Sequence, residues 1–250
     1  RSLLREMLAR MAESGASSVV VLTGEAGIGK PRLVADLLAS ARDSGVRCLG
    51  GAGDAIERIT PYFVWRSVFA DVLDLGQAPG DPAGYRAYVA AQLAGDPEMS
   101  RVAPLLNVIL PAELPENELT EQMSGQVRAS NTLTLLLRLL QHAADKTPLV
   151  LAIEDAHWLD SNSWALVAAV AQQVSPMLLV LTTRPLGDTV VTEFDTILQN
   201  PQTVTITVQP LNAVDLLALV SERLDVGELL PDVGELILRK AEGHPFFSQE

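Results

Sequence analysis

Short runs of apolar residues alternate along the chain with longer segments in which apolar positions recur every three or four residues. Five of the short runs are rich in leucine or β-branched residues, and they predict β-strands. These runs are SSVVVLT (17–23), VRCLGGA (46–52), PLVLAIED (148–155), MLLVLTT (177–183) and TVTITV (203–208). Three of them are almost continuously apolar, which is typical of parallel strands covered on both faces. Because helical segments separate the strands, we expect an α/β fold with a doubly wound parallel sheet.

Two regions show helical periodicity without a strand signal. Residues 55–147 contain four such stretches between Pro, Gly and Asp residues, which predicts a helical insert. The stretches are YFVWRSVFADVLDL, AGYRAYVAAQL, VAPLLNVIL and GQVRASNTLTLLLRLLQHAAD. After residue 210, LNAVDLLALVSERL and VGELILRKAEG are typical of amphipathic helices. We therefore expect a core at 1–210 with the insert at about 55–147, and a helical lid at 211–250 that is truncated at its C-terminus.

Charge and composition predict which partners and which cellular compartment this chain has. The chain has 31 acidic and 18 basic residues and a formal net charge of −13, so we expect no direct contact with nucleic acid or anionic lipid. Its richest apolar stretch, WALVAAVAQQVSPMLLVL, is interrupted by polar residues and predicts no membrane span. A single cysteine, Cys48, fits a reducing compartment, which predicts a cytoplasmic protein. Because the sequence begins at Arg1 without Met or a signal peptide, we expect a piece of a longer polypeptide.

A glycine-rich segment, GEAGIGKPR, follows the first predicted strand and opens a helical pattern, RLVADLLASARD. Its spacing, G-x-x-x-x-G-K, is typical of a loop that binds phosphate through backbone N–H groups and a helix N-terminus. Lys30 would reach the terminal phosphates. A glycine-rich turn without a ligand is the alternative, and the agreement of spacing, strand and helix disfavours it. The predicted nucleotide contacts are Gly24, Glu25, Ala26, Gly27, Ile28, Gly29, Lys30, Pro31 and Arg32.

Pro31 stands where such loops carry Ser or Thr. Proline removes both the hydroxyl that would bind Mg²⁺ and a backbone N–H that would donate to phosphate. It suits the first turn of a helix, so we expect the fold to survive. Losing one charge-assisted contact costs about 1.5–3 kcal/mol, or about ten- to a hundredfold in affinity. Magnesium-dependent hydrolysis is therefore expected to be slow or impaired.

Two adjacent carboxylates, Glu154 and Asp155, end the predicted strand at 148–155. Carboxyl ends of parallel strands meet at one edge of the sheet, so the pair is expected beside the glycine loop. One carboxylate would hold Mg²⁺ and the other would orient or deprotonate the attacking water. We assign Glu154 to Mg²⁺ and Asp155 to the water, and the reverse assignment stays open. The alternative is a solvated strand end that caps the next helix.

Three further groups have two interpretations each. Arg184, after the fourth predicted strand, fits a γ-phosphate sensor or a surface ion-pair partner equally well. His244 and Pro245 lie in GHPFF, which fits either a lid turn that brings them onto the nucleotide or a tight turn with packed aromatic rings, and the residues alone favour the tight turn. His157 and Trp158 are interpreted first as packing and hinge residues.

Six segments in the same order resemble a known family. They are GEAGIGKPRLV, TPYFVWRSVF, LTEQMSGQVRASNT, PLVLAIEDAHWLDSNSW, LLVLTTRP and GHPFFSQE. They resemble the AAA-like ATPase module of signal-transduction ATPases with numerous domains, as found in class III adenylyl/guanylyl cyclases of the soluble type and in large LuxR-type ATP-binding regulators. Family members usually carry an upstream G-R-x-x-E-L segment that contributes to the adenine pocket. This chain starts at about that point, with RSLLREML, which leaves open whether the pocket is complete.

The resemblance implies a P-loop NTPase with a five-stranded sheet in the order 5-1-4-3-2, and ATP with Mg²⁺ as ligands. It implies that Glu154 and Asp155 form the acidic pair, that Arg184 is the sensor, and that His244 and Pro245 touch the nucleotide from the lid. The partners implied are ATP or ADP, a cyclase or DNA-binding output domain of the same polypeptide, and other copies in an oligomer. Three functions follow: an ATP-binding regulatory switch with slow hydrolysis, a true ATPase, or a nucleotide-free scaffold for protein–protein interaction. We favour the switch.

Overall fold

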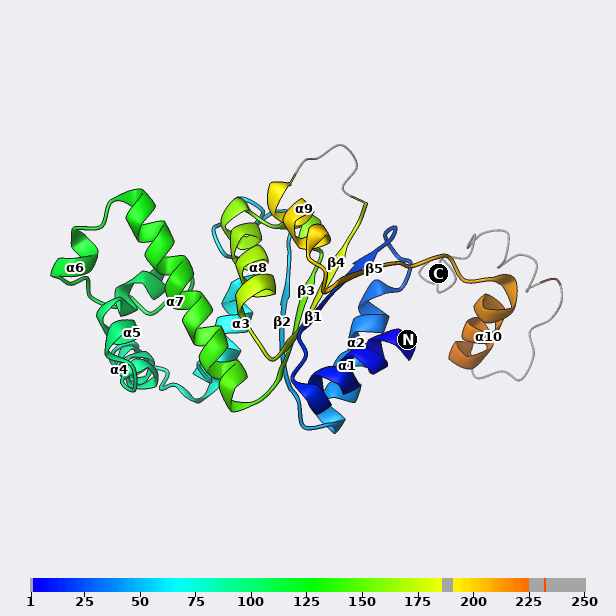
Figure 1. Cartoon of the computed structure of the whole chain (residues 1–250), viewed down its shortest axis with the longest axis horizontal. Coiled ribbons are helices and arrows are strands. Elements are labelled where there is room, and N and C mark those ends of the chain that lie inside the picture. Colours follow the sequence, from blue (N-terminus) through cyan, green and yellow to red (C-terminus); the bar gives the residue numbers. More distant parts are fainter. Residues whose placement is uncertain (1, 186–190, 225–231, 233–250) are drawn as a thin grey trace.

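Five parallel strands form one sheet at the centre of the molecule. The computed structural model describes residues 2–185, 191–224 and 232. The strands are β1 (Ser18–Thr23), β2 (Arg47–Ala52), β3 (Leu149–Glu154), β4 (Met177–Thr183) and β5 (Thr203–Thr207). Their order is β2-β3-β4-β1-β5, and all neighbours are parallel (Figure 1). The structure thus confirms the α/β class and the strand order that the resemblance implied.

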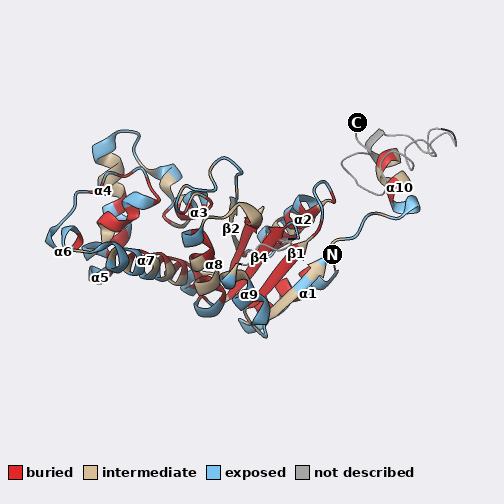
Figure 2. Ribbon diagram, turned by 90° about the horizontal axis from the view of Figure 1, so that it is seen from above, coloured by how far each residue is buried: buried red, intermediate tan, exposed pale blue. Residues whose placement is uncertain are grey.

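Helices cover both faces of the sheet. One face carries α1 (Ser2–Ser14) and α2 (Lys30–Asp43), and the other carries α3 (Trp65–Val72), α8 (Ser161–Gln173) and α9 (Thr192–Gln199). Along β1, Val20 and Leu22 pack toward α1 and α2, whereas Val19 and Val21 pack toward the opposite layer. Because side chains alternate between the two covered faces, the strand needs apolar residues at every position. Figure 2 shows the strands buried between the two layers.

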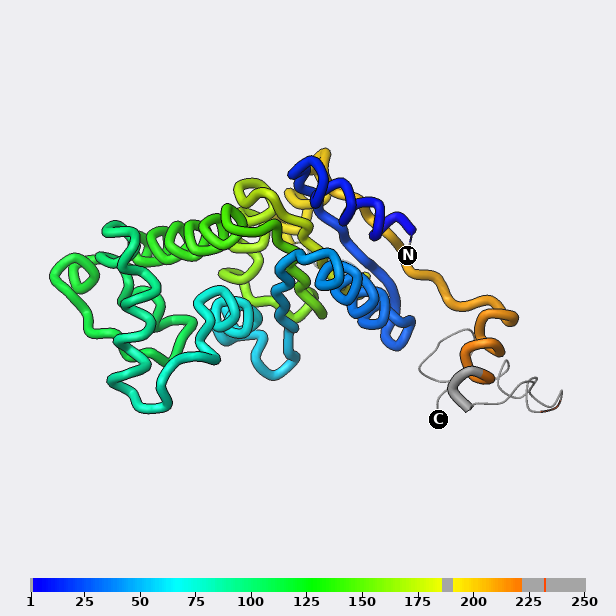
Figure 3. The backbone as a smooth tube through the Cα atoms, turned by 90° about the horizontal axis from the view of Figure 1, so that it is seen from below, coloured from blue at the N-terminus to red at the C-terminus, as the bar shows by residue number. Residues whose placement is uncertain are grey.

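The segment between β2 and β3 forms a helical arm that projects from the sheet (Figures 1 and 3). After α3 it contains η1 (Leu75–Gln77), α4 (Pro82–Leu93), α5 (Pro97–Arg101), η2 (Ala103–Val108), α6 (Glu118–Glu121) and α7 (Gly125–Lys146). Buried leucines of α4, η2 and α7 fill its interior, and this core is continuous with the core of the sheet. The predicted helix VAPLLNVIL forms the 3₁₀ helix η2, whose turns close through i→i+3 bonds such as Leu105 N–H to Val102 O at 3.0 Å.

Both ends of the chain add helical segments. α1 was not predicted from the sequence, although its buried residues, Leu4, Met7, Leu8 and Met11, have helical spacing. α10 (Ala213–Leu224) lies in the predicted lid, and VGELILRKAEG falls outside the described residues. Among the residues described, no helix is both long and apolar enough to cross a membrane.

Gly51 in β2 is a position where the fold requires glycine. A Cβ atom there would lie 2.1 Å from the backbone oxygen of Val64, so we expect Gly51→Ala to lower the free energy of unfolding by about 1–3 kcal/mol. Gly50→Ala is the matched control, because the nearest atom to its added Cβ is 3.9 Å away. Urea unfolding of both variants tests the expectation. Equal stability of the two variants would contradict the tight approach of Val64 to β2.

Candidate nucleotide-binding site

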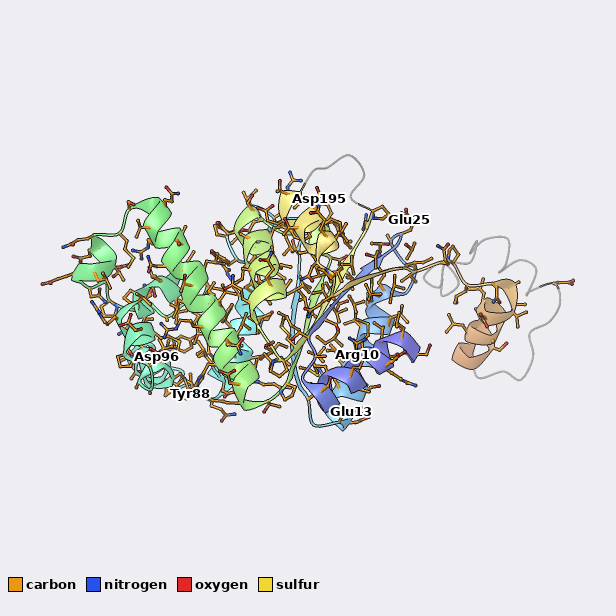
Figure 4. The ribbon with its side chains drawn as sticks, viewed as in Figure 1. Arg10, Glu13, Glu25, Tyr88, Asp96 and Asp195 are labelled. Atoms are coloured by element: carbon orange, nitrogen blue, oxygen red, sulfur yellow. The ribbon has the colours of Figure 1, made fainter. Side chains whose placement is uncertain are left out.

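The glycine loop joins the carboxyl end of β1 to the N-terminus of α2. Gly27 and Gly29 have φ values of 74° and 99°, which favour glycine because they lie in the left-handed region. Gly29 is also the N-cap residue of α2, so the loop turns directly into the first turn of the helix. Glu25 projects from this loop at the edge of the sheet (Figure 4). The backbone therefore has the strand–loop–helix form that the sequence pattern predicts.

Lys30 is enclosed by the loop that precedes it. The residue is 5% exposed, and its Nζ donates hydrogen bonds to the backbone oxygens of Gly24 at 2.6 Å and Glu25 at 2.9 Å. Burial lowers the pKa of Lys30, and the Asp155 carboxylate opposes this shift. The ammonium group thus sits at the centre of the loop, where it would meet the β- and γ-phosphates of a bound nucleotide.

Pro31 occupies the first turn of α2 and is exposed. The first intrahelical bonds run from the N–H groups of Arg32 and Leu33 to the backbone oxygen of Gly29, so the helix loses no bond at Pro31. The Arg32 side chain is 76% exposed and pairs with Asp36 on the same helix, with 3.2 Å between Nε and Oδ1. Nucleotide contact by Arg32 stays a prediction.

The acidic pair sits where β3 ends. Asp155 has a left-handed backbone, with φ of 49°, and its N–H donates to Thr182 Oγ1 in β4 at 3.1 Å. Its carboxylate is 51% exposed and raises the pKa of Lys30, so it lies within electrostatic reach of the loop. Burial raises the pKa of Glu154, and the neighbouring Asp155 adds to this shift. The two carboxylates therefore differ. The charge of Asp155 raises the pKa of Lys30, whereas burial is the main cause of the raised pKa of Glu154.

Arg184 follows directly after β4, at the same edge of the sheet. It is exposed, and its positive charge contributes to lowering the pKa of both Lys30 and His157. The structure thus brings Arg184 close to the loop and to the segment after β3. A sensor role requires this position but is not established by it. His244 and Pro245 lie outside the described residues.

His157 has two buried ring nitrogens without hydrogen-bond partners among the described residues, which the sequence did not predict. It lies in η3 (Ala156–Trp158), its side chain is 10% exposed, and its ring contacts the Trp158 ring at a centroid distance of 4.8 Å. Both ring nitrogens are buried and have no hydrogen-bond partner among the described residues; Nδ1 is 3.9 Å from Asp155 Oδ1. Burial lowers its pKa, while Asp155 opposes the shift. The packing interpretation explains the contact with Trp158 but leaves the two nitrogens unexplained.

Asp160 was also missed, and it connects this segment to the arm. Its carboxylate caps α8 by accepting hydrogen bonds from the N–H groups of Asn162 and Ser163, and it accepts a third from the N–H of Tyr62 at 3.1 Å. Tyr62 lies just before α3, so Asp160 holds the start of the arm against the region after β3. The sequence signal was an aspartate directly before Ser-Asn-Ser, which is a helix N-cap pattern.

Solved structures with a similar fold include two proteins that match almost the whole of this chain. The Aeropyrum pernix ORC1 protein, solved in complex with DNA, matches with a TM-score of 0.52 and 20% identity over 99% of this chain and 56% of that chain. Cdc6p from Pyrobaculum aerophilum matches with a TM-score of 0.54 and 12% identity over 99% of this chain and 57% of that one. At these identities the likeness shows the fold alone.

Comparison of the sequence with known proteins identifies a relative of this chain and the family whose model it matches. An uncharacterized protein, R02095, of Rhizobium meliloti (strain 1021) is 29% identical over 188 residues, which are 69% of this chain and 17% of that protein. The chain thus spans about a sixth of the length of that relative. Residues 1–181, which include the glycine loop, the arm and the acidic pair, match the AAA ATPase domain family. The chain therefore belongs to the AAA ATPase domain family.

Proposed function

We propose that this chain binds ATP at residues 24–30 and acts as a regulatory switch module of a larger signalling protein, with slow or impaired hydrolysis. One observation carries the proposal: the loop surrounds the buried Lys30, and Asp155 and Arg184 lie within electrostatic reach of it. Membership of the AAA ATPase domain family supports nucleotide binding at this loop. The glycine geometry supplies the backbone donors, and Lys30 supplies the cation.

The donor set at the end of β3 fits Mg²⁺ in part. Glu154 and Asp155 offer hard carboxylate oxygens, which this ion prefers, and Asp155 is accessible to solvent. Position 31 offers no hydroxyl oxygen, because it is proline. When bound, Mg²⁺ would neutralise charge on the β- and γ-phosphates. By their positions at the end of β3 we assign the ion to Glu154 and the activation or orientation of water to Asp155, and the variants described below test the reverse assignment.

The proposed switch role is supported by the likeness of this chain to part of a longer protein. The Rhizobium meliloti relative is much longer than this chain, which supports a module within a multidomain protein. We infer a cyclase or DNA-binding output domain from the resemblance to signal-transduction ATPases. The net charge of −13 argues that any DNA contact belongs to that output domain and not to this segment. Cys48, a free and partly buried thiol, fits a reducing cytoplasm.

Thermal melting with ATP, with ADP and without ligand, each with and without Mg²⁺, tests the function. A ligand that binds only the folded state raises the melting temperature. We expect a shift with ATP and little release of phosphate over the same period. Rapid turnover would make the chain a true ATPase. No shift with either nucleotide would favour the scaffold function and contradict our proposal.

Asp155→Asn should separate binding from hydrolysis. Asparagine tolerates the left-handed backbone at this position, so the turn and its bond to Thr182 should persist. Removing one negative charge near the polyphosphate should leave ATP affinity equal or slightly higher, while the residual hydrolysis rate falls about tenfold or more because water activation is lost. ATP titration and a phosphate-release assay measure the two effects.

Glu154→Gln is the matched variant for the second carboxylate. If it stops hydrolysis while Asp155→Asn does not, the two roles are reversed. An unchanged hydrolysis rate in both variants would mean that the acidic pair is structural.

A further inference from the structure

The His157 ring lies beside the Asp155 carboxylate without a hydrogen bond to it. Nδ1 of His157 is 3.9 Å from Oδ1 of Asp155, which is about 1 Å longer than a hydrogen bond. The His157 side chain is 10% exposed, and neither ring nitrogen has a hydrogen-bond partner in the part of the chain that the structure describes. Burying polar atoms without partners is costly, so folding alone would favour an apolar ring at this position. The two nitrogens therefore require a functional explanation.

The Asp155 carboxylate is the partner within reach of this ring. It is 51% exposed, and no described residue donates a hydrogen bond to it. The backbone of Asp155 is fixed, because its N–H donates to Thr182 Oγ1 in β4 at 3.1 Å. The side chain can thus turn while its Cα atom stays in place. A small rotation would bring one carboxylate oxygen within hydrogen-bond distance of Nδ1.

Packing holds the His157 ring in place. The turn η3 closes through two backbone bonds, from Trp158 N–H to Asp155 O at 2.9 Å and from Leu159 N–H to Ala156 O at 3.1 Å. The ring lies against the Trp158 ring at a centroid distance of 4.8 Å, and Ala156 is fully buried beside it in the chain. The ring is therefore fixed, whereas the neighbouring carboxylate is exposed. A fixed donor of this kind can set the orientation of the carboxylate.

The charges of the nucleotide site also act on this ring. Burial lowers the pKa of His157, Asp155 opposes the shift, and Arg184 and Lys30 add to it. Because the pKa is lowered overall, the ring is neutral near pH 7, with a proton on one nitrogen and a free electron pair on the other. A neutral ring that donates from Nδ1 can hold the Asp155 carboxylate without placing a further positive charge beside Lys30.

We propose that His157 is a positioning residue for ATP hydrolysis. When ATP is bound, its Nδ1–H donates to the Asp155 carboxylate and holds that carboxylate in the orientation that it needs toward the attacking water. Nε2 then carries no proton. This inference rests on the proposed function, because it requires ATP at the glycine loop and Asp155 in the role assigned above. His157 acts through Asp155 and contacts neither ATP nor the water.

Three substitutions at position 157 distinguish the two nitrogens. Asparagine places an N–H donor near the position of Nδ1, glutamine places one near the position of Nε2, and phenylalanine keeps a ring without a donor. We expect His157→Asn to retain most of the hydrolysis rate. His157→Gln and His157→Phe should each lower kcat about tenfold with an unchanged KM for ATP, because one charge-assisted hydrogen bond is lost. Phosphate release over a range of ATP concentrations measures both constants.

Two controls separate positioning from packing. His142→Phe changes an exposed histidine of α7 in the same way and should leave kcat and KM unchanged. His157→Phe should raise the melting temperature of the chain without nucleotide by a few degrees, because it removes two buried nitrogens that have no described partner. A histidine with a purely structural role would give the opposite result. His157→Phe combined with Asp155→Asn should hydrolyse ATP no more slowly than Asp155→Asn alone, since one residue acts through the other.

Nitrogen NMR of the chain labelled with ¹⁵N-histidine gives a readout that does not depend on turnover. The chain has three histidines, and the signals that disappear in His157→Asn belong to His157. Protonated and unprotonated ring nitrogens have well-separated shifts. With a non-hydrolysable ATP analogue and Mg²⁺, we expect the proton on Nδ1 and a change in the Nδ1 shift. This change should be much smaller in Asp155→Asn, because an amide oxygen is a weaker acceptor than a carboxylate.

Thermal melting of the parent chain with ATP comes first, because it tests the proposed function by itself. If ATP does not bind, the proposed function and this inference both fail. If ATP binds and the Nδ1 signal of His157 does not change, this inference alone fails. Equal hydrolysis rates of His157→Asn and His157→Phe would also overturn it. A large loss of ATP affinity in His157→Phe would instead indicate that His157 contacts the nucleotide directly, which contradicts a role through Asp155.

Discussion

Lys30→Ala is expected to abolish the rise in melting temperature that ATP produces, while the chain without nucleotide stays folded. Lys30 is the loop's only cationic side chain before Arg32, and its ammonium group is held at the centre of the loop by Gly24 and Glu25. Removing a charge-assisted contact to two phosphate groups costs about 3 kcal/mol, or roughly a hundredfold in affinity. Alanine suits the first turn of α2, so the helix should still form. Thermal melting and ATP titration measure the two parts of the prediction.

Arg42→Ala is the control for the change in net charge, because Arg42 is exposed in the last turn of the same helix. It should bind ATP as the parent chain does. If Lys30→Ala binds ATP with the affinity of the parent chain, the loop does not bind the phosphates of ATP. In that case the proposed function fails.

The loop could be predicted from the sequence because its chemistry depends on residues that are consecutive in the chain. Gly24, Gly29 and Lys30 have a fixed spacing, and the strand before them and the helix after them are local patterns as well. The strands of the sheet were predictable for the same reason, since burial on both faces leaves continuous apolar runs. The strand order came from family resemblance, because no local pattern specifies which strands become neighbours.

Other parts of the site depend on contacts between distant segments. Asp155 is held by a hydrogen bond from its N–H to Thr182 in another strand, and its carboxylate lies within electrostatic reach of Lys30. The burial of both His157 nitrogens likewise arises only when the sheet and its covering helices assemble. Sequence patterns thus identify the residue types, whereas their roles require the packed structure.

Pro31→Ser is expected to bind Mg-ATP about ten- to a hundredfold more tightly than the parent chain. Serine restores a hydroxyl ligand for Mg²⁺ and a backbone N–H for phosphate, and regaining one such charge-assisted contact corresponds to about 1.5–3 kcal/mol. Pro31 is exposed in the first turn of α2, where serine is also tolerated, so the substitution should not disturb the helix. Replacing proline lowers the stability of the chain without ligand by up to about 1 kcal/mol, because the unfolded state becomes more flexible. Titration of both chains with ATP, with Mg²⁺ and with EDTA, measures the effect.

Pro31→Ala separates the two contributions, because alanine restores the backbone N–H without the hydroxyl. If metal coordination is the main source of the gain, the serine variant should exceed the alanine variant with Mg²⁺, and the two should bind ATP equally in EDTA. If the backbone donor is the main source, alanine should equal serine under both conditions. Equal affinities of the parent chain and both variants under all conditions would contradict our account of the substitution, because ATP binding at this loop would then be independent of residue 31.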